Sequence, residues 1–333
     1  MNVNRGQVRS VIAASLLGLV GGTLVGCTNP SSNGDATNVS MQSQKDAKLQ
    51  SVGVTVGDLS NPFFVVMAEG AEQEAKKIGG DDVRVTIVSS GYDLNQQFNQ
   101  IENFIASDTD VIVLNAADSK AIRPAVDNAR AAGSVVVAVD TGVDADVDAT
   151  VTTNNVQAGE KSCQYIADRL KGKGNVVIIN GPPVTSVIER VDGCLDVLAK
   201  YPQIKILSKN QNAEGSRDGG LRVMTDLLTT FPNIDAVFAI NDPSGVGADL
   251  AANQAKRDDF FIVGVDGAPE AIEAIASQDS IYAATATQDP RGMAQTAVRV
   301  GNKVRQGQKL ESKDILIPVK LITEENVDTA EGW

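Results

Sequence analysis

The stretch SVGVTVGDLSNPFF, residues 51–64, joins a run rich in β-branched residues to a polar turn and two adjacent phenylalanines. The run predicts a buried strand. Asn61 and Pro62 predict a helix that starts directly after it, because asparagine caps free backbone N–H groups and proline suits the first helical turn. Phe63 and Phe64 are then either core side chains or an aromatic face for a ligand, and the rest of the chain has to decide between these interpretations.

The alternation of strand and helix continues along most of the chain. Segments with apolar residues at helical spacing, such as LNQQFNQIENFIAS at 94–107, separate the short apolar runs. Runs such as VIVLN (111–115) and VVVAVD (135–140) are almost entirely apolar, which is typical of strands covered by helices on both faces. The pattern predicts an α/β fold with doubly wound parallel sheets. The predicted strands are 52–57, 83–89, 111–115, 135–140, 175–180, 204–208, 235–240, 260–265 and 281–287.

The number of predicted strands exceeds one typical sheet. The β–α pattern also occurs twice, over about 51–140 and about 175–266. We therefore expect two similar lobes joined by a multi-strand hinge, with chain crossings near 152–154, 286–290 and 318–321. The expected boundaries place 51–153 plus 290–320 in the N-terminal lobe and 154–289 plus 321–333 in the C-terminal lobe.

Residues 1–26 have the layout of an export signal, in which the basic MNVNRGQVR precedes the apolar SVIAASLLGLVGGTLVG. The apolar run is short and rich in glycine, which argues against a membrane-spanning helix. LVGC at 24–27 resembles a bacterial lipobox, in which the cysteine, here Cys27, is lipidated and becomes the N-terminus of the processed protein. The alternative is an ordinary signal peptide with an incidental cysteine. Residues 27–50 are polar and predict a flexible tether.

The composition excludes several classes of function. The chain has 333 residues, a formal net charge of −13 and no histidine. The negative charge disfavours nucleic acid and anionic lipid headgroups as partners. The absence of histidine removes Ser-His-Asp and Cys-His catalytic arrangements as well as His-ligated zinc. Because no phosphate-binding or calcium-binding loop is found either, we expect neither a metal nor a cofactor.

Two cysteines besides Cys27 would face an oxidising compartment. Cys163 and Cys194 fall on two predicted helices that flank one predicted strand, so that contact between them is geometrically feasible. A bridge would close a loop of about 30 residues, worth about 3–4 kcal/mol in the chain-entropy model. The alternative is a pair of buried free thiols.

A polar residue follows most of the predicted strands. Ligands of open parallel sheets bind at the carboxyl ends of the strands, so two lobes that face each other there would enclose a polar cleft. Carboxylates and amides suit the hydroxyl groups of a neutral polyhydroxylated molecule. Each of these residues can instead be an ordinary helix cap or turn former. The polar residues that follow predicted strands are Asp58, Ser90, Asn115, Asp140, Asn180, Asn241, Asp242 and Asp266.

Four motifs in this order resemble the ribose-type periplasmic sugar-binding proteins, which are the substrate-binding components of ABC importers. The motifs are SNPFF (60–64), VFAIND (237–242), IVGVDGAPE (262–270) and ATATQDP (284–290). The resemblance covers about residues 50–325 and implies the type I periplasmic binding protein fold. LacI-family regulators share this fold, but the export signal and the lack of an N-terminal helix-turn-helix disfavour them.

The resemblance also implies a set of ligand-binding residues. Gln288 and Asp289 both fall near the family's hinge-side glutamine, and either can serve. Thr141 stands where ribose binders have an arginine, and Ile188 takes the place of a second arginine if Arg190 is a structural one. A third phenylalanine of the family is replaced near Gly215, beside Glu214. The positions that match the family's ligand contacts are Asn61, Phe63, Phe64, Asp140, Asn241 and Asp266.

These departures argue against ribose and in favour of another pentose or hexose, a sugar alcohol or a cyclic polyol. The resemblance implies a monomeric, lipid-anchored protein that faces the periplasm or the cell exterior. It would close around its ligand and dock on the permease of an ABC importer. One alternative is a sensor that presents the ligand to a chemoreceptor or a histidine kinase. Another is an exported enzyme that uses Asp140 and Asp266 as paired acids.

Overall fold

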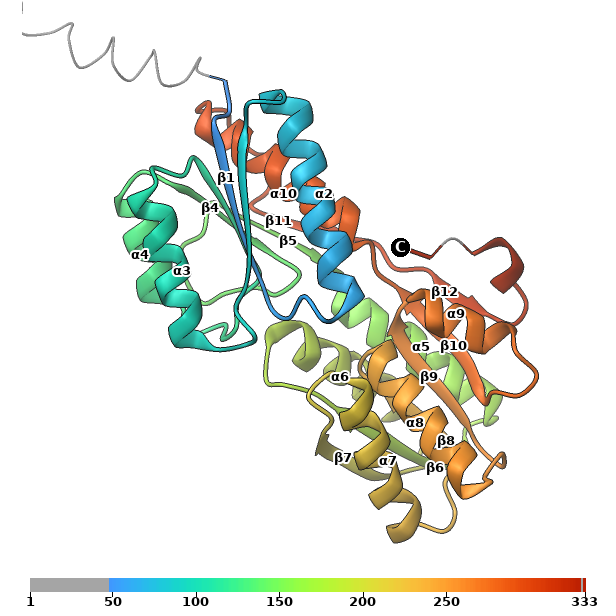
Figure 1. Cartoon of the computed structure of the whole chain (residues 1–333). Coiled ribbons are helices and arrows are strands. Elements are labelled where there is room, and N and C mark those ends of the chain that lie inside the picture. Colours follow the sequence, from blue (N-terminus) through green and yellow to red (C-terminus); the bar gives the residue numbers. More distant parts are fainter. Residues whose placement is uncertain (1–47, 331) are drawn as a thin grey trace, which may run out of the picture. The chain divides into compact units, whose positions relative to one another are not determined.

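The computed structural model describes residues 48–330 and 332–333 (Figure 1). The expected export signal, Cys27 and most of the tether lie outside these residues. The described chain forms two six-stranded sheets, each flanked by helices. This arrangement confirms the predicted α/β fold with two doubly wound lobes.

The first sheet belongs to the N-terminal lobe, and all its strands are parallel, in the order β11-β5-β4-β3-β1-β2. Its strands are β1 (Ser51–Val56), β2 (Arg84–Ser89), β3 (Val111–Leu114), β4 (Val135–Val139), β5 (Ala149–Thr153) and β11 (Asp314–Ile317). Its helices are α2 (Pro62–Gly79), α3 (Leu94–Ala106), α4 (Arg123–Ala131) and α10 (Pro290–Arg305). One apolar core joins α2 and α10 to the sheet, and a second core joins α3 and α4 to it. Both faces are therefore covered, as the apolar strands predict.

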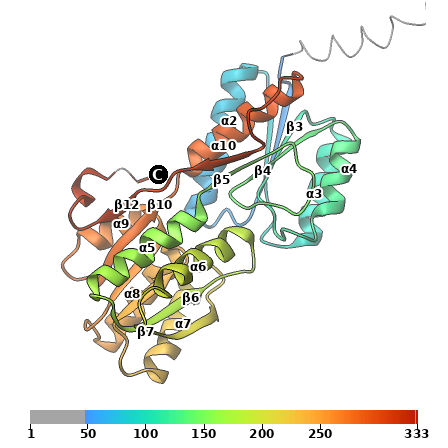
Figure 2. The same cartoon turned by 180° about the vertical axis from the view of Figure 1, so that it is seen from behind.

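The second sheet belongs to the C-terminal lobe and has the order β12-β10-β9-β8-β6-β7, with only β12 antiparallel to its neighbour. Its strands are β6 (Lys173–Asn180), β7 (Gln203–Asn212), β8 (Ala236–Ala239), β9 (Phe261–Asp266), β10 (Tyr282–Thr287) and β12 (Leu321–Thr323). Its helices are α5 (Asn155–Arg169), α6 (Thr185–Leu198), α7 (Arg217–Thr230), α8 (Asp242–Ala255), α9 (Pro269–Ala276) and the short η1 (Val327–Thr329). Helices α5 and α6 share one core with the sheet (Figure 2), and α7, α8 and α9 share another.

The chain passes between the two sheets at three places. It leaves the first sheet after β5, returns after β10 to form α10 and β11, and passes again from β11 to β12. The sequence does not predict β5, β11 or β12. β5 reads ATVTT and lacks a continuous apolar run, β11 is an edge strand whose residues alternate in exposure, and β12 has only three residues.

Helices α5 and α6 are joined by the predicted disulfide. Cys163 and Cys194 are bridged, with their Cα atoms 5.0 Å apart, and both side chains are fully buried. The two helices approach so closely that a Cβ on Gly159 would lie 1.9 Å from the carbonyl oxygen of Arg190. The free-thiol alternative is thereby excluded, and α6 is held firmly against the lobe.

Within residues 48–330 and 332–333, we find no helix with the length and apolar character that crossing a bilayer requires.

Candidate functional site

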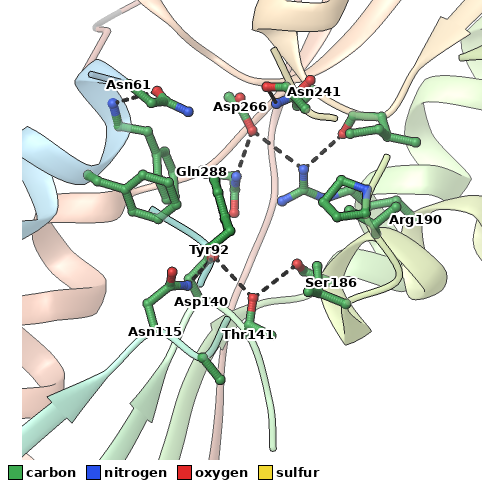
Figure 3. A pocket seen from close by; sticks show the side chains of 18 residues that line it. Asn61, Tyr92, Asn115, Asp140, Thr141, Ser186, Arg190, Asn241, Asp266 and Gln288 are labelled. Atoms are coloured by element: carbon green, nitrogen blue, oxygen red, sulfur yellow. Dashed lines mark hydrogen bonds and ion pairs between the residues drawn. The ribbon is translucent and has the colours of Figure 1, made fainter. Parts of the chain in front are cut away.

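Polar strand ends of both lobes meet in one pocket (Figure 3). Of the eight predicted from the sequence, Asn115, Asp140, Asn241 and Asp266 line it, whereas Asp58, Ser90, Asn180 and Asp242 do not. Its cavity has a volume of about 70 Å³. The N-terminal lobe contributes Asn61, Phe63, Phe64, Tyr92, Asn115, Ala116, Asp140 and Thr141. The remaining lining residues are Pro182, Val184, Ser186, Val187, Arg190, Gly215, Ile240, Asn241, Asp266 and Gln288. The pocket therefore lies at the carboxyl ends of the two sheets, as parallel sheets predict.

Asp140 supplies the carboxylate of the N-terminal lobe. It directly follows β4 and is 7% exposed. The amide of Asn115, which follows β3, donates to Asp140 Oδ2 at 2.9 Å, and the Thr141 hydroxyl donates to the same oxygen at 3.3 Å. The hydroxyls of Thr141 and Ser186 lie 3.4 Å apart, so the two lobes touch at the floor of the pocket.

Asp266 supplies the carboxylate of the C-terminal lobe, at the end of β9. Gln288 Nε2 donates to Asp266 Oδ1 at 2.7 Å, and Gln288 Oε1 accepts from the Thr153 hydroxyl at 2.8 Å. Thr153 ends β5 and Gln288 follows β10, so both lie where the chain passes between the sheets. The carboxylate of Asp266 is therefore coupled through one side chain to two of the three chain crossings.

Arg190 is the buried cation of the pocket, and it is 4% exposed. Its Nε donates to Asn155 Oδ1 at 2.9 Å and its Nη1 donates to the Ile240 carbonyl at 2.8 Å. The Nη1 atom also lies 3.5 Å from Asp266 Oδ1. Arg190 thus ties α6 to the start of α5 and to the end of β8, and it offers a positive charge to Asp266.

Both pocket carboxylates belong to residues with an unusual backbone. Asp140 has φ 65°, in the left-handed region that aspartate adopts more readily than most non-glycine residues, and Asp266 has φ 140°, which is favourable only for glycine. Strained positions of this kind cluster where a side chain has to be aimed at a ligand. Asp108, Lys171, Glu214 and Lys256 also have positive φ without lining the pocket, so the backbone geometry is consistent with a ligand role for Asp140 and Asp266 but does not assign it.

Burial governs the charge of these acids. It raises the pKa of Asp140, and it raises the pKa of Asp266 to about 6, while the positive charge of Arg190 opposes the rise in both. Behind Asp266, burial and the nearby Asp266 charge raise the pKa of Asp242 well above its usual range. Asp242 accepts hydrogen bonds from the hydroxyls of Tyr282 at 2.7 Å and Thr285 at 2.8 Å, so it supports the site from beneath.

The raised pKa of Asp266 predicts how stability depends on pH. The folded protein holds the proton of the Asp266 carboxyl more tightly than the unfolded chain does. Protonation of Asp266 therefore contributes fully to the free energy of unfolding below about pH 4, and this contribution is lost as the pH rises through about 6. We expect the free energy of unfolding, measured by urea denaturation, to fall between pH 4.5 and 7.5. Repulsion among surface acids also lowers the free energy of unfolding over this pH range. The Asp266→Asn variant keeps that repulsion but lacks the titrating carboxyl, so the wild type should show the steeper fall. An equally steep fall in this variant would contradict the assignment to Asp266.

The structure brings most of the expected ligand residues together. Asn61, Phe63, Phe64, Asp140, Thr141, Asn241, Asp266 and Gln288 line the pocket, whereas Ile188 and Asp289 do not. Ile188 lies on the outer side of α6 and is 48% exposed. The side chain of Asp289 caps α10 by accepting from the Gly292 N–H at 2.7 Å, so Gln288 is the residue that reaches the pocket.

Phe63 and Phe64 are core side chains that also line the pocket. Each is 5% exposed and belongs to the core of the N-terminal lobe, and each also lines the pocket. Their rings meet edge to face, with centroids 5.3 Å apart. Asn61 caps α2 by accepting from the Phe63 N–H at 3.0 Å, which fixes the turn that places both rings.

Sequence reasoning missed Tyr92, Ser186 and the position of Arg190 in the pocket. Tyr92 follows β2, and its ring meets the edge of Phe64 with centroids 6.1 Å apart. Partial burial and the charges of Asp140, Asp58 and Asp266 raise the pKa of Tyr92, so its hydroxyl remains a hydrogen-bond donor at neutral pH. No pattern singles out Tyr92, whereas Ser186 and Arg190 lie on the same helix as Ile188, the expected pocket position.

The described residues contain no cluster of acidic or cysteine side chains that could hold a metal ion. The lining instead offers carboxylates, amides, hydroxyls and aromatic faces. Such a set can bind the hydroxyl groups and the apolar C–H faces of a small molecule.

The family model for the periplasmic binding protein domain matches residues 52–309. The chain belongs to this family. It is a ribose-type periplasmic sugar-binding protein with the type I fold, which confirms the family expected from the four motifs. Proteins of this family bind solutes outside the cytoplasm and are not catalytic, so this binding protein is not an enzyme.

Three similar proteins illustrate the family. The ribose import binding protein of Bacillus subtilis is 34% identical over 275 residues, which cover 82% of this chain and 87% of the relative. The xylitol-binding protein of Mycolicibacterium smegmatis is 31% identical over 333 residues, covering 99% of this chain and 89% of the relative. The crystal structure of a Caulobacter myo-inositol binding protein with myo-inositol is 30% identical, with a TM-score of 0.78, covering 85% of this chain and 96% of that one.

Proposed function

We propose that this binding protein captures a small neutral sugar or polyol, other than ribose, for an ABC importer. The observation that carries the proposal is the pairing of Asp140 and Asp266, one from each lobe, across a cavity walled by Phe63 and Phe64. Carboxylates form strong charge-assisted bonds with hydroxyl donors, and aromatic rings suit the C–H faces between them. A ligand held by both acids would bridge the lobes.

The charges in the pocket support a neutral ligand. Arg190 balances at most one of the two carboxylates, so a phosphate or carboxylate group on the ligand would meet uncompensated negative charge. Thr141 and Ser186 also line the pocket, and their hydroxyl groups are suited to hydrogen bonds with the hydroxyl groups of a neutral ligand. Relatives that bind xylitol and myo-inositol support a polyol in particular.

We further propose how the protein is organised around this site. The lobes would be 51–153 plus 290–320 and 154–289 plus 321–333, and they would close about the three chain crossings. The N-terminal LVGC motif supports a lipid anchor at Cys27 that keeps the monomer at the outer side of the membrane, next to its permease. The ligand-binding set would be Asn61, Phe63, Phe64, Tyr92, Asn115, Asp140, Thr141, Ser186, Arg190, Asn241, Asp266 and Gln288.

A ligand screen tests the proposal. Purified protein is examined by thermal shift and calorimetry with ribose, xylose, arabinose, galactose, xylitol, sorbitol, myo-inositol and glycerol, and with ribose 5-phosphate and gluconate as charged comparators. We expect at least one neutral compound, and neither charged one, to raise the melting temperature. Asp266→Asn should weaken binding by about 10- to 100-fold, because it removes a charge-assisted bond.

The matched control is Asp249→Asn. Asp249 is a partly buried acid of the same lobe that accepts from the Ile281 N–H at 3.1 Å and does not line the pocket. Its replacement should leave the affinity unchanged. The proposal fails if no neutral compound binds, or if Asp266→Asn binds the ligand as tightly as the wild type and the Asp249→Asn control do.

A further inference from the structure

Trp333, the only tryptophan of the chain, contacts both lobes beside the pocket. Its indole Nε1–H donates to the backbone carbonyl of Asp266, in the C-terminal lobe, at 2.8 Å. Its ring meets Phe63, in the N-terminal lobe, edge to face, with centroids 5.5 Å apart and an interplanar angle of 84°. Trp333 therefore touches one proposed ligand residue from each lobe.

The segment that carries Trp333 is attached to the C-terminal lobe. It follows β12 and η1, and the buried Val327 of η1 belongs to the core formed by α7, α8 and α9. A Cβ on Gly332 would lie 3.4 Å from Pro269 and Ile272 of α9. The next side chain, Trp333, packs against the core of the N-terminal lobe instead. Gly332 therefore lies against the C-terminal lobe, and the next residue, Trp333, packs on the N-terminal lobe.

Trp333 also extends the aromatic side of the pocket. Tyr92, Phe64, Phe63 and Trp333 form a row of edge-to-face contacts. Tyr92, Phe64 and Phe63 line the pocket, and Trp333 supports the row from outside it. The Asp266 carbonyl accepts from the indole and from the Gln288 N–H, at 2.7 Å, so two donors hold the backbone that aims this carboxylate.

We propose that Trp333 is a positioning residue that latches the two lobes together over bound ligand. This inference rests on the proposed function. Because the C-terminal lobe carries Trp333, separation of the lobes must break its contact with Phe63, whereas closure restores it. A contact made only in the closed form raises the population of that form even before ligand binds, and it thereby lowers the apparent dissociation constant.

The test uses a ligand from the screen and two variants of the full chain. Trp333→Phe keeps an aromatic ring but loses the N–H bond, and we expect about 3- to 10-fold weaker binding. Trp333→Ala loses both contacts and should weaken binding by about 10- to 100-fold. Stopped-flow measurements should place most of the loss in the dissociation rate, since the lobes must separate before the ligand can leave.

The matched control is Tyr165→Phe, in α5. Tyr165 also makes one polar contact, from Arg169 at 2.9 Å, and one edge-to-face contact, with Phe261 at 6.4 Å, but it does not line the pocket. The Tyr165→Phe variant should bind the ligand with the affinity and the dissociation rate of the wild type. Trp333→Ala with wild-type affinity and dissociation rate would overturn the proposal.

A second measurement needs no ligand and separates failure of the latch from failure of the proposed function. Trp333 gives the single indole N–H signal in a ¹⁵N-correlated NMR spectrum. We expect Phe63→Leu to shift this signal, because the adjacent ring current is lost, and we expect the indole proton to exchange slowly. If no compound binds, the proposed function fails, and an unshifted, rapidly exchanging indole signal would refute the latch as well.

Discussion

Replacing Arg190 by methionine should lower the free energy of unfolding by about 3–5 kcal/mol, as expected when one partner of a buried ion pair is removed. Methionine fills a similar volume but leaves the Asn155 oxygen and the Ile240 carbonyl without their donor. It also leaves Asp140 and Asp266 without the charge that opposes the rise in their pKa values. Urea denaturation at pH 7 measures the loss.

The control for this prediction is Arg222→Met, in α7. Arg222 is exposed and makes a single ion pair with Glu214, at 3.5 Å. Surface pairs of this kind contribute about 1 kcal/mol or less. A loss in Arg190→Met no larger than that of the control would mean that Arg190 is solvated rather than buried in its network. The Arg190→Met variant should also bind ligand poorly, because its two acids are then harder to ionise.

Removing the Cys163–Cys194 disulfide should cost about 3–4 kcal/mol of stability, because the bridge restricts a loop of 31 residues in the unfolded chain. The double variant Cys163→Ala/Cys194→Ala removes the bridge without leaving a thiol. We expect its unfolding midpoint in urea to match that of the wild type in reductant. In addition, α6 should pack less firmly on α5, which loosens the helix that carries Ser186 and Arg190 into the pocket.

Reductant serves as the internal control for the disulfide. It should destabilise the wild type and leave the double variant unchanged, because the bridge is the only difference on which it can act. If the double variant is as stable as the oxidised wild type, the helices are held by their glycine-mediated packing and the bridge adds nothing. That outcome would contradict the prediction.

The sheets and the polar residues at their carboxyl ends can both be predicted from the sequence, because each buried apolar run predicts a strand and also locates the residue at its end. The runs that end at Asp140 and Asp266 are apolar enough to require burial on both faces, and the residue after such a run reaches the ligand edge of a parallel sheet. Local patterns were therefore sufficient for these positions. They were insufficient for β11 and β12, which are stabilised by neighbours brought to them by the tertiary fold.

The α6 assignments show where a linear pattern fails. If Arg190 is structural, the resemblance places the pocket position at Ile188. Residues two apart on a helix point about 200° apart, so Ile188 faces solvent when Arg190 faces the pocket. Arg190 is both structural and part of the lining, a combination that residue type alone does not indicate. Tyr92 and Trp333 reach the site through long-range contacts with Phe64 and Phe63, which no local pattern encodes.

The order of the strands has a consequence for how the protein is made. Helix α10 and strand β11 complete the N-terminal lobe, yet they follow almost the whole C-terminal lobe in the chain. During synthesis, β1 to β5 therefore emerge well before α10, which together with α2 covers one face of their sheet. Contacts so distant in sequence form slowly. The first lobe should remain incompletely folded until nearly all of the chain is available, which keeps the chain in a form suited to translocation before it folds.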